Sequence, residues 1–74
     1  MAIYLTNLQK SVIIALTENS MRVTRTARAM HYNPNTIKYH VAAIKKKTKL
    51  DPQNFFELIK LYEVATRGKE GARK

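Results

Sequence analysis

The stretch that decides the fold covers residues 26–41 and reads TARAMHYNPNTIKYHV. Its centre, Asn33-Pro34, is a strong signal for the start of a helix, because Asn is a good N-cap and Pro fits the first helical position. Three apolar residues then recur at helical spacing, which predicts one buried stripe: Ile37, Val41 and Ile44. The sequence therefore predicts a helix over residues 34–48, preceded by a short helix and a tight turn.

Two helices are expected on the N-terminal side of residue 34. The first covers about residues 6–18, where Thr6 and Gln9 have the spacing of a capping box. The second is short, about residues 25–31, with Thr24 as its N-cap. The apolar edge of this second helix contains a small residue, Ala27, which would let another helix approach closely.

A fourth helix is expected after residue 50. Its start resembles that of the third, with Asp51 as the cap and Pro52 at the first helical position. We expect it to end near residue 65 or 66. The chain then divides into one domain, residues 1–66, and a basic disordered tail, residues 67–74, which contains both glycines and several charges.

Charge is distributed unevenly along the chain. Fourteen Lys and Arg residues against five Asp and Glu residues leave a net charge of +9. Residues 19–50 contain no acid but eight basic residues: Arg22, Arg25, Arg28, Lys38, Lys45, Lys46, Lys47 and Lys49. A one-sided positive field attracts a polyanion, so the charge favours a nucleic acid as partner. The alternative on charge alone is a solvated surface that keeps the protein soluble.

Several classes of protein are not expected from this composition. There is no cysteine, so a disulfide framework and a thiolate zinc site are excluded. His31 and His40 have no carboxylate beside them and predict no metal site. No catalytic arrangement is visible, so we expect neither an enzyme nor a cofactor. No apolar run is long enough for a membrane span, and we expect the protein in the cytoplasm, on the nucleoid.

The second and third helices together have the pattern of a helix-turn-helix. Ala27 and Ile37 would be the contact points that fix the angle between them. A helix fits the major groove of B-DNA, while the start of the preceding helix meets the phosphate backbone. We therefore expect nine residues to contact double-stranded DNA: Arg22, Thr24, Arg25, Asn35, Thr36, Lys38, Tyr39, Lys45 and Lys46.

Residues 26–41 resemble the C-terminal helix-turn-helix of PucR-type bacterial regulators, which has a TA-R-A-L pattern, a short turn and then NT-hydrophobic-basic-Y. The segment 36–41 with Lys47 is also similar to the recognition helix of LuxR-type four-helix domains. The resemblance implies a transcription regulator in which Lys38 reads bases and Thr36 contacts phosphate. One departure is Lys49, which stands where the resemblance leads us to expect glycine.

The fourth helix is apolar around more than half of its girth, wider than one core contact needs. The simplest expectation is that Phe55, Phe56 and Tyr62 belong to the core. The excess apolar surface also suggests a homodimer in which Phe55, Phe56, Ile59 and Tyr62 form the interface. The resulting hypothesis is a small repressor or autoregulator that acts as a dimer, with no membrane association and no evident small-molecule effector.

Two other functions are compatible with the sequence. The helices could form a protein-interaction module that docks on the transcription machinery or on another regulator, with little DNA contact. RNA binding ranks lower, because a helix cannot read the narrow major groove of A-form RNA. Within the third helix, His40 lies at the edge of the buried stripe, so a packing role is favoured over a pH switch.

Overall fold

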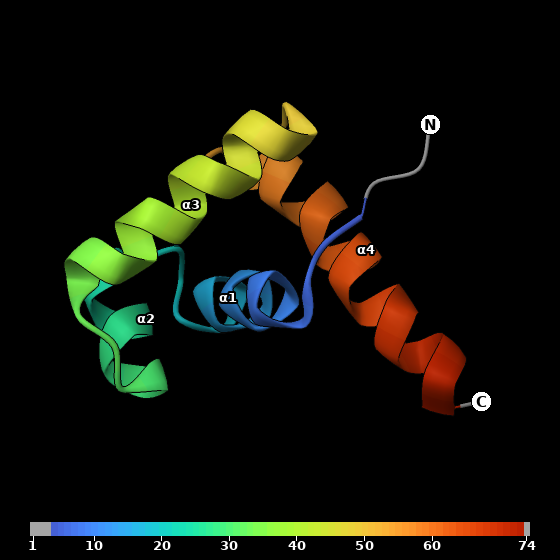
Figure 1. Ribbon diagram of the computed structural model, residues 1–74, viewed down its shortest axis with the longest axis horizontal. Helices are drawn as coiled ribbons and strands as arrows, with labels where there is room; N and C mark the ends of the chain where they lie inside the picture. Colours follow the sequence, from blue (N-terminus) through green and yellow to red (C-terminus); the bar gives the residue numbers. More distant parts are fainter. Residues whose placement is uncertain (1–3, 74) are drawn as a thin grey trace.

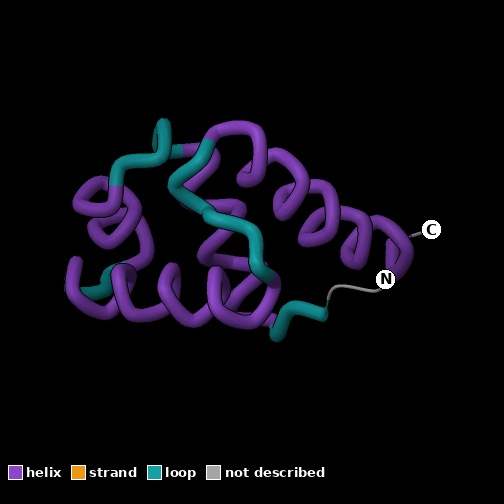
Figure 2. The backbone as a smooth tube through the Cα atoms, turned by 90° about the horizontal axis from the view of Figure 1, so that it is seen from above, coloured by secondary structure: helices purple, strands orange, loops and turns teal. Residues whose placement is uncertain are grey.

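The protein is a bundle of four α-helices joined by short loops (Figures 1 and 2). The computed structural model describes the backbone of residues 4–73 and the side chains of residues 4–66. The helices are α1 (Asn7–Glu18), α2 (Val23–Met30), α3 (Pro34–Thr48) and α4 (Phe55–Arg73). No strand occurs in residues 4–73. The predicted all-α, four-helix fold is therefore confirmed.

α1 is the central helix, and it packs against each of the other three. In Figure 1, α2 and α3 lie on one side of α1 and α4 on the other, and α3 and α4 diverge from the corner where α3 ends. All four helices contribute to one hydrophobic core: Leu5, Val12, Ile13, Leu16, Ala27, Ile37, Val41, Ile44, Leu58, Leu61 and Ala65. The buried stripe predicted for the third helix is confirmed.

The two ends of α1 are fixed by local hydrogen bonds. The Thr6 hydroxyl accepts from the Gln9 backbone N–H at 3.1 Å, and Gln9 Oε1 accepts from the Thr6 backbone N–H at 3.0 Å, so the capping box is confirmed. At the other end Asn19 Nδ2 donates to the Ala15 carbonyl at 2.7 Å. The backbone then adopts the left-handed conformation at Ser20 and Met21.

α2 begins earlier than predicted, at Val23, so Thr24 is not its N-cap. Arg22 occupies the cap position and makes no side-chain capping bond. The first turn is closed instead by the buried Thr26, whose backbone N–H and hydroxyl both donate to the Arg22 carbonyl, at 2.9 and 2.7 Å. The hydroxyl shares an acceptor that the helix backbone already uses, so the start of α2 has no side-chain cap that capping rules could have detected.

α3 begins as predicted, with Pro34 in the first turn and Asn33 Oδ1 accepting from the Asn35 backbone N–H at 2.8 Å. It ends at Lys49, which has a φ of 66°. This is the left-handed conformation that favours glycine, since a side chain there costs about 1–2 kcal/mol. Glycine, the residue expected at position 49, would remove this backbone strain.

α4 begins at Phe55, so the predicted cap at Asp51 and first position at Pro52 are wrong. Asp51 Oδ1 accepts from the Gln53 backbone N–H at 2.9 Å and forms a turn. Asn54 is the side chain that caps α4, because its Oδ1 accepts from the backbone N–H groups of Phe56 and Glu57. Two residues of the type that favours N-caps, Asp51 and Asn54, thus occur three positions apart, and the second of them lies directly before the apolar run of α4.

The end of α4 also differs from the prediction. Its backbone is helical through Arg73, beyond residues 65 and 66. No proline follows to stop a helix that is already nucleated and packed, and each of the two glycines costs only about 1 kcal/mol. The side chains of residues 67–74 lie outside the described residues, and the division into a domain and a basic tail stays a prediction.

The core face of α4 is not the aromatic one. Leu58, Leu61 and Ala65 are buried at helical spacing, and they form the contact with the rest of the core. Phe55 is 58% exposed and Phe56 is 74% exposed. The expectation that these two aromatic residues belong to the core is therefore wrong: Phe56 lies opposite the leucine stripe of the helix, and Phe55 lies on its flank.

Candidate nucleic-acid interface

α2, the turn over residues 31–33 and α3 form the helix-turn-helix. Ala27 and Ile37 are both buried in the core where α2 packs against α3. The turn closes at His31, whose φ of 61° is left-handed, and the Tyr32 backbone N–H donates to the Ala27 carbonyl at 2.8 Å. The buried contact fixes the angle between the helices, and it directs the opposite face of α3 to solvent.

Six of the nine predicted contact residues belong to α3, and most of these six are exposed. Asn35, Lys38, Tyr39 and Lys46 are exposed, whereas Thr36 is half-buried. The exposed side of α3 is rigid, because the other side of the same helix is locked into the core by Ile37, Val41 and Ile44. A rigid helix with exposed donors is suited to reading base edges, since base readout needs fixed geometry.

An aromatic cluster lies at the start of α3. Tyr39 is 70% exposed, and its ring meets the His40 ring edge-on at a centroid distance of 5.6 Å. On the other side the Tyr32 ring lies 6.4 Å from the His40 ring. His40 is half-buried. Contacts of this kind orient the rings, and here they hold Tyr39 at the exposed face.

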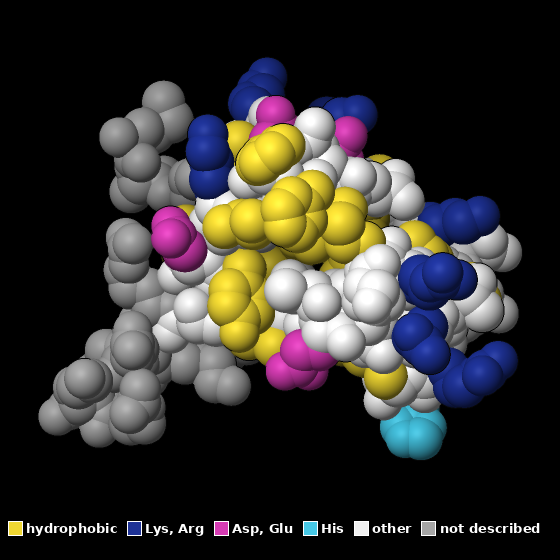
Figure 3. All heavy atoms as spheres, turned by 180° about the vertical axis from the view of Figure 1, so that it is seen from behind, with side chains coloured by type: hydrophobic (Ala, Val, Ile, Leu, Met, Phe, Trp, Pro, Cys, Tyr) yellow, Lys and Arg dark blue, Asp and Glu magenta, His cyan; other side chains and the backbone are white. Residues whose placement is uncertain are grey.

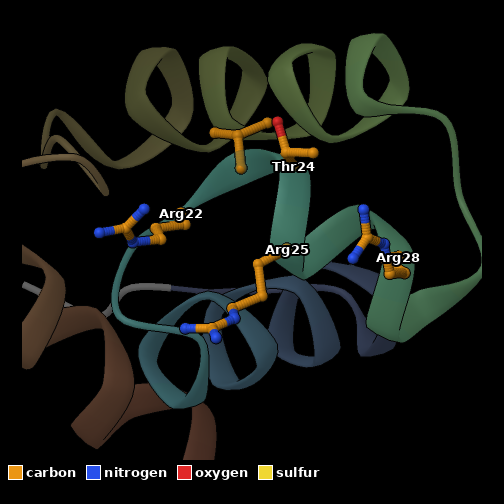
Figure 4. Close-up of a pocket in the computed structure, with 5 residues that line it drawn as sticks. Arg22, Thr24, Arg25 and Arg28 are labelled. Atoms are coloured by element: carbon orange, nitrogen blue, oxygen red, sulfur yellow. The ribbon is translucent and has the colours of Figure 1, made fainter.

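A basic pocket lies at the start of α2 (Figure 4). It is lined by Arg22, Val23, Thr24, Arg25 and Arg28. In Figure 4, Thr24 is directed toward α3 with Arg22 and Arg28 on either side of it, while Arg25 is directed toward α1. Arg28 was not among the predicted contacts. Its spacing from Arg22 and Arg25 was the available signal, because residues three apart are neighbours on a helix.

The lysines at the end of α3 project in different directions. Lys45 Nζ lies 3.8 Å from Asp51 Oδ2 on one flank. On another flank Lys47 Nζ donates to Gln9 Oε1 at 2.9 Å and lies 4.8 Å from the centre of the Tyr4 ring. Lys46 is exposed on the outer face between them. The run therefore surrounds the helix end rather than forming one line of charge.

A groove runs beside α3 on the Lys45 flank. It is lined by Val23, Lys38, Val41, Ala42, Lys45, Asp51 and Gln53. Sequence reasoning named Lys38 and Lys45 as contact candidates, but it did not indicate that Asp51 and Gln53 line the same groove. These two belong to the loop before α4, and only the fold brings that loop beside α3.

The described residues show neither a group of metal-binding side chains nor a helix long and apolar enough to cross a membrane. Four helices, a buried contact between α2 and α3, and an exposed basic face together define a helix-turn-helix domain of the DNA-binding class. Residues 11–65 match the family described as the PucR C-terminal helix-turn-helix domain. The chain belongs to this family. No match was found among curated proteins or among solved structures.

Proposed function

We propose that this protein is a transcription regulator that binds specific sequences in duplex DNA, with α3 in the major groove. The observation that carries the proposal is the exposed side of α3, where Asn35 and Tyr39 lie opposite the buried stripe and Lys38 is exposed on the adjoining flank. The basic pocket at the start of α2 supports it, because a phosphate could lie there while α3 reads the bases.

The contact residues have different roles in this proposal. Lys38 reads guanine through its O6 and N7 acceptors, and Asn35 reads adenine. The phosphate backbone is held by residues at the starts of the two helices and at the end of α3: Arg22, Thr24, Arg25, Thr36, Lys45 and Lys46. Phosphate contacts fix the register of the protein on the duplex, while base contacts carry the sequence information.

The simplest regulatory mechanism is occupancy of a promoter. A protein bound across the site excludes the transcription machinery, and this needs no surface beyond the DNA interface itself. We therefore infer a repressor or an autoregulator that acts on the nucleoid without a small-molecule effector.

The active form that we propose is a homodimer joined through α4. Phe55, Phe56 and Ile59 are exposed, and Tyr62 is half-buried beside them. Figure 3 shows hydrophobic side chains gathered in the middle of one face, with lysine and arginine side chains along its edge. Apolar surface of this kind is typical of an interface between copies. Two-fold symmetry would then place two copies of α3 about one turn of DNA apart.

Replacing Phe56 by Ser is expected to convert the dimer to a monomer in sedimentation equilibrium, because it removes the most exposed apolar side chain of the α4 face. Tyr39→Ser is the matched control: it removes an equally exposed aromatic ring from α3 and should leave the dimer intact. A monomeric wild-type protein, or a Phe56→Ser variant that still dimerises, would contradict the dimer.

Selection from a random duplex library tests the function as a whole. We expect enrichment of an inverted repeat whose half-sites are about one helical turn apart. Affinity for it should fall with salt with a log–log slope of about −5, if five or six phosphates are neutralised. Retention of DNA without an enriched sequence would refute specific regulation. No retention even at low salt would favour the protein-interaction module, for which the exposed α4 face is the docking surface.

A further inference from the structure

Asp51 is the first acidic residue after the acid-free stretch, and the fold places it beside α3, the helix to which we assign DNA contact. It lines the groove beside α3 together with Lys38, Ala42 and Lys45. A carboxylate at such a position repels the phosphates that the neighbouring lysines attract. Its location therefore calls for a role other than general affinity for DNA.

The Asp51 carboxylate is held in place by its own loop. The Asp51 backbone N–H donates to Glu57 Oε1 at 2.6 Å, which ties the residue to the first turn of α4. Asp51 Oδ1 accepts from the Gln53 backbone N–H at 2.9 Å. Oδ2 then faces Lys45 Nζ at 3.8 Å. Because two hydrogen bonds fix the residue, the ion pair is formed with a preorganised carboxylate and constrains the longer, more flexible lysine.

We propose that Asp51 is a specificity-determining residue of the DNA interface, and that it acts by restraining Lys45. The inference rests on the proposed function. A flexible lysine can contact whichever phosphate lies nearest, so it strengthens every complex regardless of sequence. A lysine already paired with a carboxylate gains less from a random phosphate. In the specific complex, base contacts by α3 fix the register of the protein on the DNA. One phosphate then lies where the restrained Lys45 side chain can contact it.

The expected size of this effect on DNA affinity follows from the solvent exposure of the Lys45–Asp51 ion pair. The side chain of Lys45 is 60% exposed and that of Asp51 is 35% exposed, so water screens the pair. We expect loss of the restraint to raise the affinity for unrelated duplex DNA by about threefold. The salt dependence of that binding should become steeper by about one unit of log–log slope.

Asp51→Asn tests this inference in the full-length protein. Asparagine keeps an Oδ1 acceptor for the Gln53 N–H and removes only the charge. Glu63→Gln is the matched control, because it makes the same change in net charge at an exposed position of α4. Since residue 63 shares a helix face with Phe56 and Ile59, sedimentation equilibrium first establishes that this variant has the same oligomeric state as the wild type. The readouts are the dissociation constants for the selected sequence and for a scrambled duplex, each measured over a range of salt. The unfolding midpoint of each variant is compared alongside.

We expect Asp51→Asn to tighten binding to the scrambled duplex about threefold more than binding to the selected sequence, and so to lower their ratio. Glu63→Gln should leave the ratio unchanged. Equal shifts on both duplexes, or equal behaviour of the two variants, would overturn the inference while leaving the proposed function intact. A wild-type protein that binds neither duplex would overturn the proposed function and the inference with it.

A second comparison separates restraint of Lys45 from simple repulsion of DNA. In a Lys45→Gln background, Asp51→Asn has no ammonium to release. We expect its effect on the ratio to fall to that of the Glu63→Gln control. If Asp51→Asn lowers the ratio equally with and without Lys45, the positioning role is refuted.

Discussion

Lys38→Ala is expected to lower affinity for the selected sequence by about 10- to 100-fold, because a base contact by one side chain contributes about 1–3 kcal/mol of discrimination. Lys38 is exposed on α3 and lines the groove beside it, so truncation removes the ammonium without disturbing the core. Affinity for an unrelated duplex should change by less than about threefold, since that binding depends on phosphates. Equilibrium titration of both duplexes at one salt concentration measures the difference.

Lys46→Ala provides the contrast for Lys38→Ala. Lys46 lies at the end of the same helix and is equally exposed, but we assign it to phosphate. Its loss should weaken binding to both duplexes by a similar factor and reduce the salt slope by about one. If Lys38→Ala behaves in the same uniform way, Lys38 is a phosphate contact, and the readout of sequence must come from other residues of α3.

The elements that could be predicted from the sequence are those fixed by neighbours along the chain. Thr6 and Gln9 are three residues apart, and Asn33 directly precedes Pro34, so both helix starts could be read locally. The start of α2 could not, because Arg22 at its cap position makes no side-chain capping bond that a sequence rule could detect. At α4 two capping residues compete, and the rule selected Asp51 where the structure uses Asn54.

The contacts that the α3 lysines make with other segments could not be predicted from the sequence either. Lys47 bonds to Gln9, which is 38 residues away, and Lys45 pairs with a residue of the following loop. Spacing along the chain carries no information about such contacts. The outer face of α3 was predictable because the 3.6-residue period places Asn35, Tyr39 and Lys46 opposite the buried stripe.

Hydrophobicity alone could not predict whether the phenylalanines or the leucines of α4 are buried. The sequence offers leucine and phenylalanine at adjacent angles around the helix, and either set fits a core. The structure buries Leu58 and Leu61 and exposes Phe55 and Phe56. This choice matters for function, because it leaves an apolar face for a partner and makes the leucine stripe the support of the helix-turn-helix.

Leu61→Ala is therefore expected to destabilise the protein by about 2–5 kcal/mol, the usual cost of a cavity at a fully buried leucine. A chain of 74 residues has a total stability of only about 4–11 kcal/mol, so this loss is a large part of the whole. Leu61 belongs to the core that α4 shares with α1, and α1 in turn supports α2 and α3. DNA binding should consequently fall with the folded fraction and recover at low temperature or low denaturant.

Leu8→Ala is the matched control for this prediction, since it removes the same atoms from a leucine of α1 that is 39% exposed. We expect it to cost less than about 1 kcal/mol, because water already contacts much of the side chain. Chemical denaturation followed by circular dichroism measures both variants. If the two free energies of unfolding agree within about 1 kcal/mol, Leu61 does not anchor α4 in the core. The helix-turn-helix would then have to be stable without that contact, through the packing of α1 against α2 and α3 alone.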